Sequence, residues 1–231
     1  LHIEVLEKEI YDMTPIIETP PSTDFVDENK ETQADNVFKQ SLLQADFSEL
    51  KKRNEDTKGW ISVMGTTIHY PFVQTSNNEF YLNHSFDQKR NGAGWIFLDY
   101  RNHLEETNRN LILYAHGGSK QALFGDLKNT LTTEWFSNPQ NFMIKMSTEY
   151  ENSMWEIFSV YEVPTTSDYL QIHFSSENEF QDFLTHLKNR SVHDFSTSIL
   201  NTNSILTLST CSSDTDKVVL HAKLIKRERR I

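Results

Sequence analysis

The chain has 231 residues, of which 37% are hydrophobic and 12% aromatic, enough apolar material for one large globular domain or a domain with an appendage. Its net charge of −11 argues against a nucleic-acid partner, because such proteins bind phosphates through a surplus of Lys and Arg. The single cysteine excludes an intramolecular disulfide, and no apolar run approaches the roughly 20 residues that span a bilayer.

The N-terminal part, residues 1–53, is expected to form a helical appendage with an acidic linker. Residues 1–50 contain twelve Asp or Glu and three Lys, so they hold most of the negative charge. Residues 1–12 have the apolar spacing of a short amphipathic helix, and the prolines from Pro15 to Pro21 end it. Residues 22–36 are acidic and polar, which is typical of a loop. A second helix is predicted over about 37–53, with an apolar face made of Phe38, Leu42, Leu43, Phe47 and Leu50.

The remainder, residues 54–231, changes to short runs rich in β-branched and aromatic residues. Eight such runs predict a mainly β fold, either a closed barrel or a sandwich. The predicted strands are Trp60–Val63, Thr67–Tyr70, Trp95–Leu98, Asn110–Ala115, Phe142–Met146, Met154–Val163, Ile205–Thr210 and Val218–Ile225.

Two helices are predicted among these strands. A short one could follow residue 122, over Leu123–Thr130. A longer one is expected over Glu177–Arg190, with Ser175 or Ser176 as candidate N-cap. Its apolar residues recur at positions i, i+3, i+4 and i+7, namely Phe180, Phe183, Leu184 and Leu187.

The single cysteine and one histidine stand where two apolar strands end. Cys211 closes the run that starts at Ile205, and His116 closes the run that starts at Leu111 and is followed by two glycines. A lone cysteine is more often a small buried apolar residue than a nucleophile. A Cys and a His at the ends of core strands can nevertheless meet, and together they supply a nucleophile and an acid/base group for acyl transfer.

Several blocks of the sequence resemble the sortase family. The stretch Thr207-Leu-Ser-Thr-Cys211 matches the family signature T-L-x-T-C. Tyr114-Ala-His116 followed by Phe124-Gly-Asp-Leu127 is similar to the family's histidine block, usually Y-G-H-N and then M-F-x-x-L. Residues 56–61, 65–68 and 70–74 are similar to the opening strands of class B sortases. The resemblance extends from about residue 54 to the C-terminus.

This resemblance implies a fold and an activity. The expected fold is a closed β-barrel of about eight strands, with N-terminal helices packed outside and a helix inserted before the cysteine strand. The expected activity is that of a cysteine transpeptidase without a cofactor, in which Cys211 attacks a sorting motif and His116 acts as acid/base. Ser209, Thr210 and Phe124 are the expected substrate contacts.

The resemblance also implies partners and a location. The substrate would be a surface-protein or pilin precursor with a C-terminal sorting signal, and the acceptor would be an amine of a cell-wall precursor or of a pilin lysine. The chain opens at Leu1 without a Met, so it is expected to be an ectodomain whose N-terminal anchor was removed. Its place would be the outer face of a Gram-positive cell membrane.

Two residues depart from the family pattern. Lys217 stands where the family usually has an arginine, and Gly117 stands where an asparagine commonly follows the histidine. Lys217 is interpreted either as a weaker clamp for the oxyanion or as an ordinary solvated lysine, and the sequence leaves both open.

The departure at Lys217 keeps a rival function open, a catalytically weak barrel that binds pilus or wall proteins. A plain cysteine hydrolase is the second rival, although neither the papain order of Cys before His nor the caspase motif Q-A-C-x-G matches. No histidine lies in an H-E-x-x-H pattern, so no metal site is predicted. His221, in the last strand, is expected to be structural.

Overall fold

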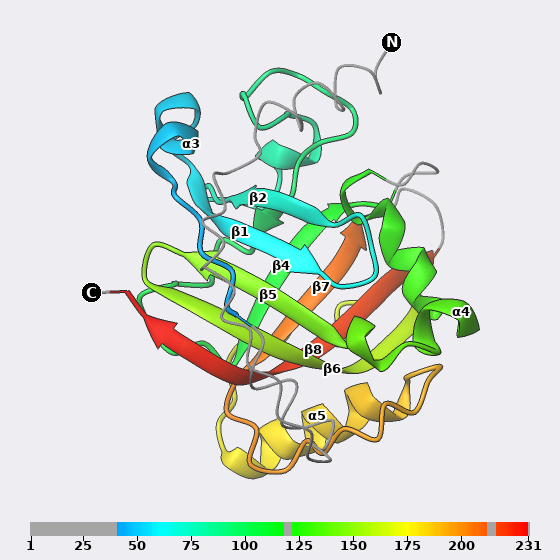
Figure 1. The fold of residues 1–231 in the computed structure, drawn as a ribbon. Coiled ribbons are helices and arrows are strands. Elements are labelled where there is room, and N and C mark those ends of the chain that lie inside the picture. Colours follow the sequence, from blue (N-terminus) through cyan, green and yellow to red (C-terminus); the bar gives the residue numbers. More distant parts are fainter. Residues whose placement is uncertain (1–40, 118–121, 212–215, 231) are drawn as a thin grey trace, which may run out of the picture.

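The strands of this protein close into a barrel (Figure 1). The computed structural model describes residues 41–117, 122–211 and 216–230, without the side chain of Cys211. The helix predicted over residues 1–12 and the linker after it lie outside the described residues. The strands follow one another around the barrel in the order β1-β2-β3-β4-β7-β8-β6-β5. Their bounds are β1 Thr57–Val63, β2 His69–Val73, β3 Phe97–Leu98, β4 Asn110–His116, β5 Met143–Thr148, β6 Glu151–Pro164, β7 Ile205–Cys211 and β8 Asp216–Arg229.

Each of the eight predicted runs forms a strand, and of the two predicted architectures the barrel is correct. Two neighbouring pairs are parallel, β2 with β3 and β4 with β7, and the other pairs are antiparallel. A parallel pair requires a long crossover connection, which β5, β6 and the following helix supply between β4 and β7. The crossover brings the ends of β4 and β7 to the same rim of the barrel.

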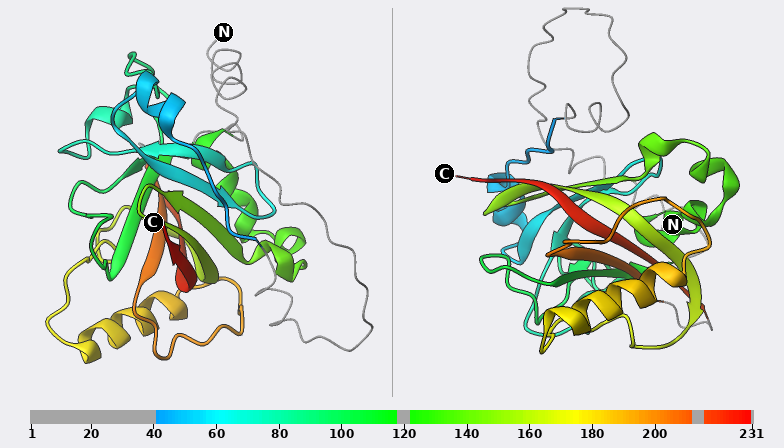
Figure 2. Two further views of the ribbon diagram at one scale, coloured as in Figure 1. Left: turned by 60° about the vertical axis from the view of Figure 1, so that its left-hand side comes forward. Right: turned by 90° about the horizontal axis from the view of Figure 1, so that it is seen from below.

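The predicted long helix is α5, Glu177–Asn189, and it lies along the outside of the barrel (Figure 2). Ser176 is its N-cap, since the Ser176 side chain accepts a hydrogen bond from the Glu179 amide. The apolar face of α5 forms a second hydrophobic core with the outer faces of β6, β7 and β8. The buried members of this core are Phe158, Tyr161, Tyr169, Phe180, Phe183, Leu184, Leu187, Ile205 and Val219.

The remaining helices are short. The one predicted over Leu123–Thr130 is present as a 3₁₀ helix, η2, which spans Leu123–Leu131. The others are α3 Ser48–Arg53, η1 Phe80–Leu82, α4 Thr133–Phe136 and η3 Pro139–Asn141.

The helix predicted over 37–53 is wrong for most of its described length, because only α3 is helical. Residues 41–47 are not helical, and their buried side chains, Leu43, Ala45 and Phe47, alternate with exposed ones. The barrel supplies the reason. Ser147 Oγ accepts from the Ala45 amide at 3.2 Å, and Arg230 Nη2 donates to the Ala45 carbonyl at 2.9 Å. These bonds replace the ones a helix would make. The predicted division at residue 53 remains a prediction.

Candidate active site

The ends of β4 and β7 bring His116 and Cys211 together. The two strands pair in parallel from Asn110 and Ile205 up to His116 and Cys211, which are register partners across the ladder. Six of the seven residues of β4 are buried, so its end has a well-determined place on the rim. The sequence placed the two residues at strand ends, and the parallel pairing places those ends side by side.

The imidazole of His116 is oriented by a backbone carbonyl. His116 is half-buried, and its Nε2 lies 2.7 Å from the carbonyl oxygen of Leu82. A carbonyl only accepts hydrogen bonds, so Nε2 carries the hydrogen and donates it. The neutral ring then has its lone pair on Nδ1, which is therefore the nitrogen that exchanges a proton. Sequence patterns of side chains did not indicate Leu82, because its contribution is a main-chain atom.

Gly94 permits this contact between Leu82 and the histidine. Its φ of +62° lies in the left-handed region that favours glycine. A Cβ on Gly94 would lie 2.4 Å from the Tyr81 carbonyl oxygen, 2.9 Å from the Leu82 carbonyl oxygen and 3.1 Å from His116 Cδ2. Any larger residue would therefore push the carbonyl and the ring apart. No sequence pattern had indicated Gly94.

Lys217 lies on the third strand that reaches this rim. The antiparallel pairing of β7 and β8 includes Ser209 with Val219, and two residues further along the two strands stand Cys211 and Lys217. Side chains two apart in a strand share a face, so Lys217 is on the same face as Val219. It is half-buried within the described structure. His116, Cys211 and Lys217 thus occupy the ends of three adjacent strands.

The glycine that departs from the family pattern has a local explanation. A Cβ on Gly117 would lie 2.9 Å from both Cβ and Cγ2 of Thr210, closer than such atoms approach in proteins. Thr210 is itself held, since its Oγ1 accepts from the Val218 amide at 2.9 Å. An asparagine at position 117 would require Thr210 to move. The absence of a side chain at Gly117 therefore leaves the space that Thr210 occupies in this chain.

The three side chains predicted to contact substrate are buried. Phe124 and Ser209 are 0% exposed and Thr210 is 2% exposed. Phe124 belongs to the barrel core, and Ser209 Oγ lies 3.0 Å from the hydroxyl of Tyr169. A substrate would reach these side chains only after the segments that cover them moved. Their contact with substrate stays a prediction.

His221 lies inside a directed chain of hydrogen bonds. Thr207 donates its hydroxyl hydrogen to Asn110 Oδ1 at 2.7 Å, so Thr207 Oγ1 accepts from His221 Nδ1 at 2.9 Å. His221 Nε2 then accepts from the Tyr161 hydroxyl at 2.9 Å. Burial lowers the pKa of His221 to about 3, so the ring is neutral at pH 7. Both ring nitrogens are satisfied by the fold, which agrees with the predicted structural role.

Within residues 41–117, 122–211 and 216–230, no three His, Cys, Asp or Glu side chains converge in a way that could hold a metal ion. No helix in the same part of the chain is long and apolar enough to cross a membrane.

Comparison with known proteins identifies the family. The family model described as the Sortase domain matches residues 61–225, most of the barrel. The chain belongs to the sortase family. Sortase B of Staphylococcus aureus (strain NCTC 8325 / PS 47) is 32% identical over 191 residues, which cover 81% of this sortase and 78% of the relative.

Solved sortase B structures share the fold. The Staphylococcus aureus sortase B–substrate complex superposes with a TM-score of 0.71 and 34% identity, over 78% of this chain and 84% of that one. A sortase B complexed with triglycine gives a TM-score of 0.71 and 33% identity, over 78% and 85% of the two chains. The predicted class B resemblance, barrel and cysteine transpeptidase activity are confirmed, and the alternative of a binding module is not favoured.

Proposed function

We propose that Cys211 is the nucleophile of this transpeptidase and that His116 is its acid/base group. The observation that carries this proposal is their register pairing at the ends of β4 and β7. A free thiol has a pKa of about 8.5, so only a small fraction is thiolate at neutral pH. A protonated imidazole beside the thiol favours the thiolate and raises that fraction.

The reaction then follows from the roles of the two groups. The thiolate attacks the carbonyl carbon of the scissile peptide bond and forms a tetrahedral oxyanion. When this intermediate collapses, the C–N bond breaks and His116 gives its proton to the departing amine. The acyl part stays on Cys211 as a thioester. An incoming amine attacks the thioester carbonyl, His116 takes up the amine's proton, and the thiolate leaves.

The substrate and the acceptor are inferred from the chemistry of the relatives. One Staphylococcus aureus sortase B was solved with a substrate and another sortase B with triglycine, a peptide that ends in an amine. For this sortase we infer a sorting signal of a surface-protein precursor as acyl donor and an amine as acceptor. The amine belongs to a cell-wall precursor or to a pilin lysine. Sortases act at the surface of Gram-positive cells, and we propose that this one does so as an anchored ectodomain.

A peptide assay tests the proposal. The protein is incubated with peptides that carry candidate sorting motifs, and its intact mass is measured with and without an added amine such as triglycine. We expect a covalent acyl adduct on the protein, and the amine should divert the product from hydrolysis to transfer. An adduct that only water resolves would favour a hydrolase, and no adduct with any peptide would contradict the proposed function.

The ammonium of Lys217 is proposed to stabilise the oxyanion, in the place where the family usually has arginine. We expect Lys217→Ala to slow acyl-enzyme formation by up to about 10²-fold, because one mobile ammonium is a weaker donor than a planar guanidinium. The alkylation of Cys211 by iodoacetamide should hardly change, since the oxyanion forms only after attack. Single-turnover kinetics with one peptide measure the first rate.

Lys217→Arg is the matched variant. A guanidinium should restore or raise the rate if Lys217 serves the oxyanion. If Lys217→Ala reacts like the wild type, Lys217 is a solvated strand residue and another group stabilises the oxyanion.

A further inference from the structure

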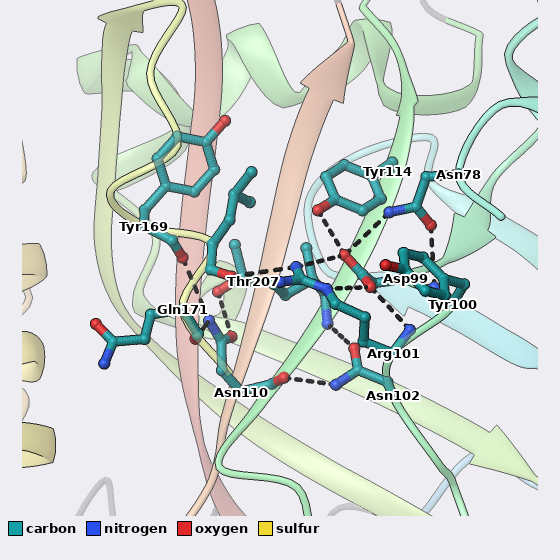
Figure 3. Close-up of polar contacts among 12 residues, drawn as sticks. Asn78, Asp99, Tyr100, Arg101, Asn102, Asn110, Tyr114, Tyr169, Gln171 and Thr207 are labelled. Atoms are coloured by element: carbon teal, nitrogen blue, oxygen red, sulfur yellow. Dashed lines mark hydrogen bonds and ion pairs between the residues drawn. The ribbon is translucent and has the colours of Figure 1, made fainter. Parts of the chain in front are cut away.

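The connection between β6 and α5 is held to the barrel by side chains. Three successive backbone carbonyls of this connection accept hydrogen bonds from Asn110, the first residue of β4, and from Arg101, in the connection between β3 and β4. Asn110 Nδ2 donates to the carbonyls of Tyr169, at 3.3 Å, and of Gln171, at 2.9 Å. Arg101 Nη2 donates to the carbonyl between them, that of Leu170, at 3.2 Å. Figure 3 shows these donors gathered at one place. The connection therefore has a defined path although it forms no strand there.

A buried carboxylate aligns the arginine of this anchor. Asp99 is 0% exposed, and its oxygens accept from Arg101 Nε and Nη2, both at 2.8 Å, from the Tyr114 hydroxyl at 2.9 Å and from Asn78 Nδ2 at 3.1 Å (Figure 3). Burial raises the pKa of Asp99, but the hydrogen bonds from Arg101 and Tyr114 outweigh it and leave the pKa below its ordinary value. Asp99 is therefore charged, and its bidentate ion pair orients the guanidinium of Arg101 toward the Leu170 carbonyl.

The anchored connection reaches both strands that carry the proposed catalytic pair. Tyr169 is fully buried, and its hydroxyl lies 3.0 Å from Ser209 Oγ in β7. Ser209 is the register partner of Tyr114 in β4, the residue that donates to Asp99. Ser209 and Tyr114 each stand two residues before the catalytic position of their strand. Because residues two apart share a face, the anchor lies on the face of the sheet where the catalytic positions stand.

The same connection starts beside the active site. Strand β6 ends at Pro164, which pairs with Asp216, and the preceding Val163 pairs with Lys217. The chain thus leaves the barrel at the catalytic rim and returns along β7 to Asn110 at the opposite end of β4. Its first residues border the proposed site, and its next ones are those that the anchor holds.

We propose that Asp99, Arg101 and Asn110 are positioning residues of this sortase. They hold the β6–α5 connection against β4 and β7, so that the sorting peptide meets a preformed wall beside the nucleophile. None of the three touches the reacting atoms, and all three act through the carbonyls of the connection. The inference rests on the proposed function.

Arg101→Lys tests the anchor, because a compact ammonium keeps the charge beside Asp99 but cannot bind both its oxygens and the Leu170 carbonyl. We expect the KM for the sorting peptide to rise about 5- to 10-fold, as for the loss of one typical intramolecular hydrogen bond. The kcat should stay within about twofold of the wild-type value, because the catalytic groups are unchanged. Alkylation of Cys211 by iodoacetamide should keep its rate. Asp99→Asn removes the charge that aligns Arg101 with little change of shape, and it should also raise the KM for the sorting peptide.

Arg230→Lys is the matched control. Arg230 Nη2 also donates to a backbone carbonyl of a segment outside the strands, that of Ala45 at 2.9 Å, and it lies at the far end of β8. This variant should leave KM unchanged. An unchanged KM in both Arg101→Lys and Asp99→Asn would overturn the inference, as would slower alkylation with a parallel fall in kcat. Acyl-enzyme formation by the wild type is measured first, so a failure of the proposed function is seen there and not in the variants.

Discussion

Replacing Cys211 with alanine is expected to abolish both acyl-enzyme formation and transpeptidation. The chain has no other cysteine, so no second thiol can take over the attack on the scissile carbonyl. Intact-mass measurement of the variant with a sorting peptide should show no adduct. Transpeptidation above a few per cent of the wild-type rate would contradict the assignment of Cys211 as nucleophile.

The fold of Cys211→Ala serves as the control. Cysteine and alanine differ by a single sulfur atom, so the variant should stay folded. We expect its melting temperature to lie within about 4 °C of that of the wild type, the shift that about 1 kcal/mol causes in a domain of this size. A much larger shift would mean that lost activity reports unfolding instead of lost chemistry.

Replacing His116 with alanine is expected to lower the rate of acyl-enzyme formation by about 10²–10⁴-fold, the usual contribution of a positioned acid/base group. It should also slow the alkylation of Cys211 by iodoacetamide at neutral pH, because the thiolate loses a cationic neighbour. Stopped-flow or quenched alkylation and single-turnover acylation measure the two rates on the same preparation.

His103→Ala provides the matched control, since His103 is exposed and lies on the connection between β3 and β4. It should change neither rate. If His116→Ala slows acylation while the alkylation rate stays at the wild-type value, His116 acts only as the later proton donor. If neither rate changes, His116 is not part of the site.

Much of the fold and the candidate Cys–His pair could be predicted from the sequence, because both depend on local side-chain patterns. Runs of β-branched residues predicted all eight strands, and the spacing of Phe180, Phe183, Leu184 and Leu187 predicted α5 together with its cap. The signature that ends at Cys211 and the block around His116 indicated the family and the candidate pair. In such cases the information lies in side chains close together in the sequence.

Only the tertiary structure determined how these segments pair and which groups contact the candidate site. Residues 41–47 have helical spacing, yet Ala45 forms hydrogen bonds with the barrel instead: its amide donates to Ser147 Oγ, and its carbonyl accepts from Arg230 Nη2. The carbonyl of Leu82 orients His116, and no side-chain pattern reports a carbonyl because every residue has one.

The parallel pairing of β4 with β7 depends on a crossover whose path no short motif specifies. The sequence by itself therefore determined the eight strands, α5 and the candidate residues for the chemistry. The long-range pairing, burial and main-chain hydrogen bonds of the closed barrel determined which of those residues meet, because these depend on segments that are far apart in the chain.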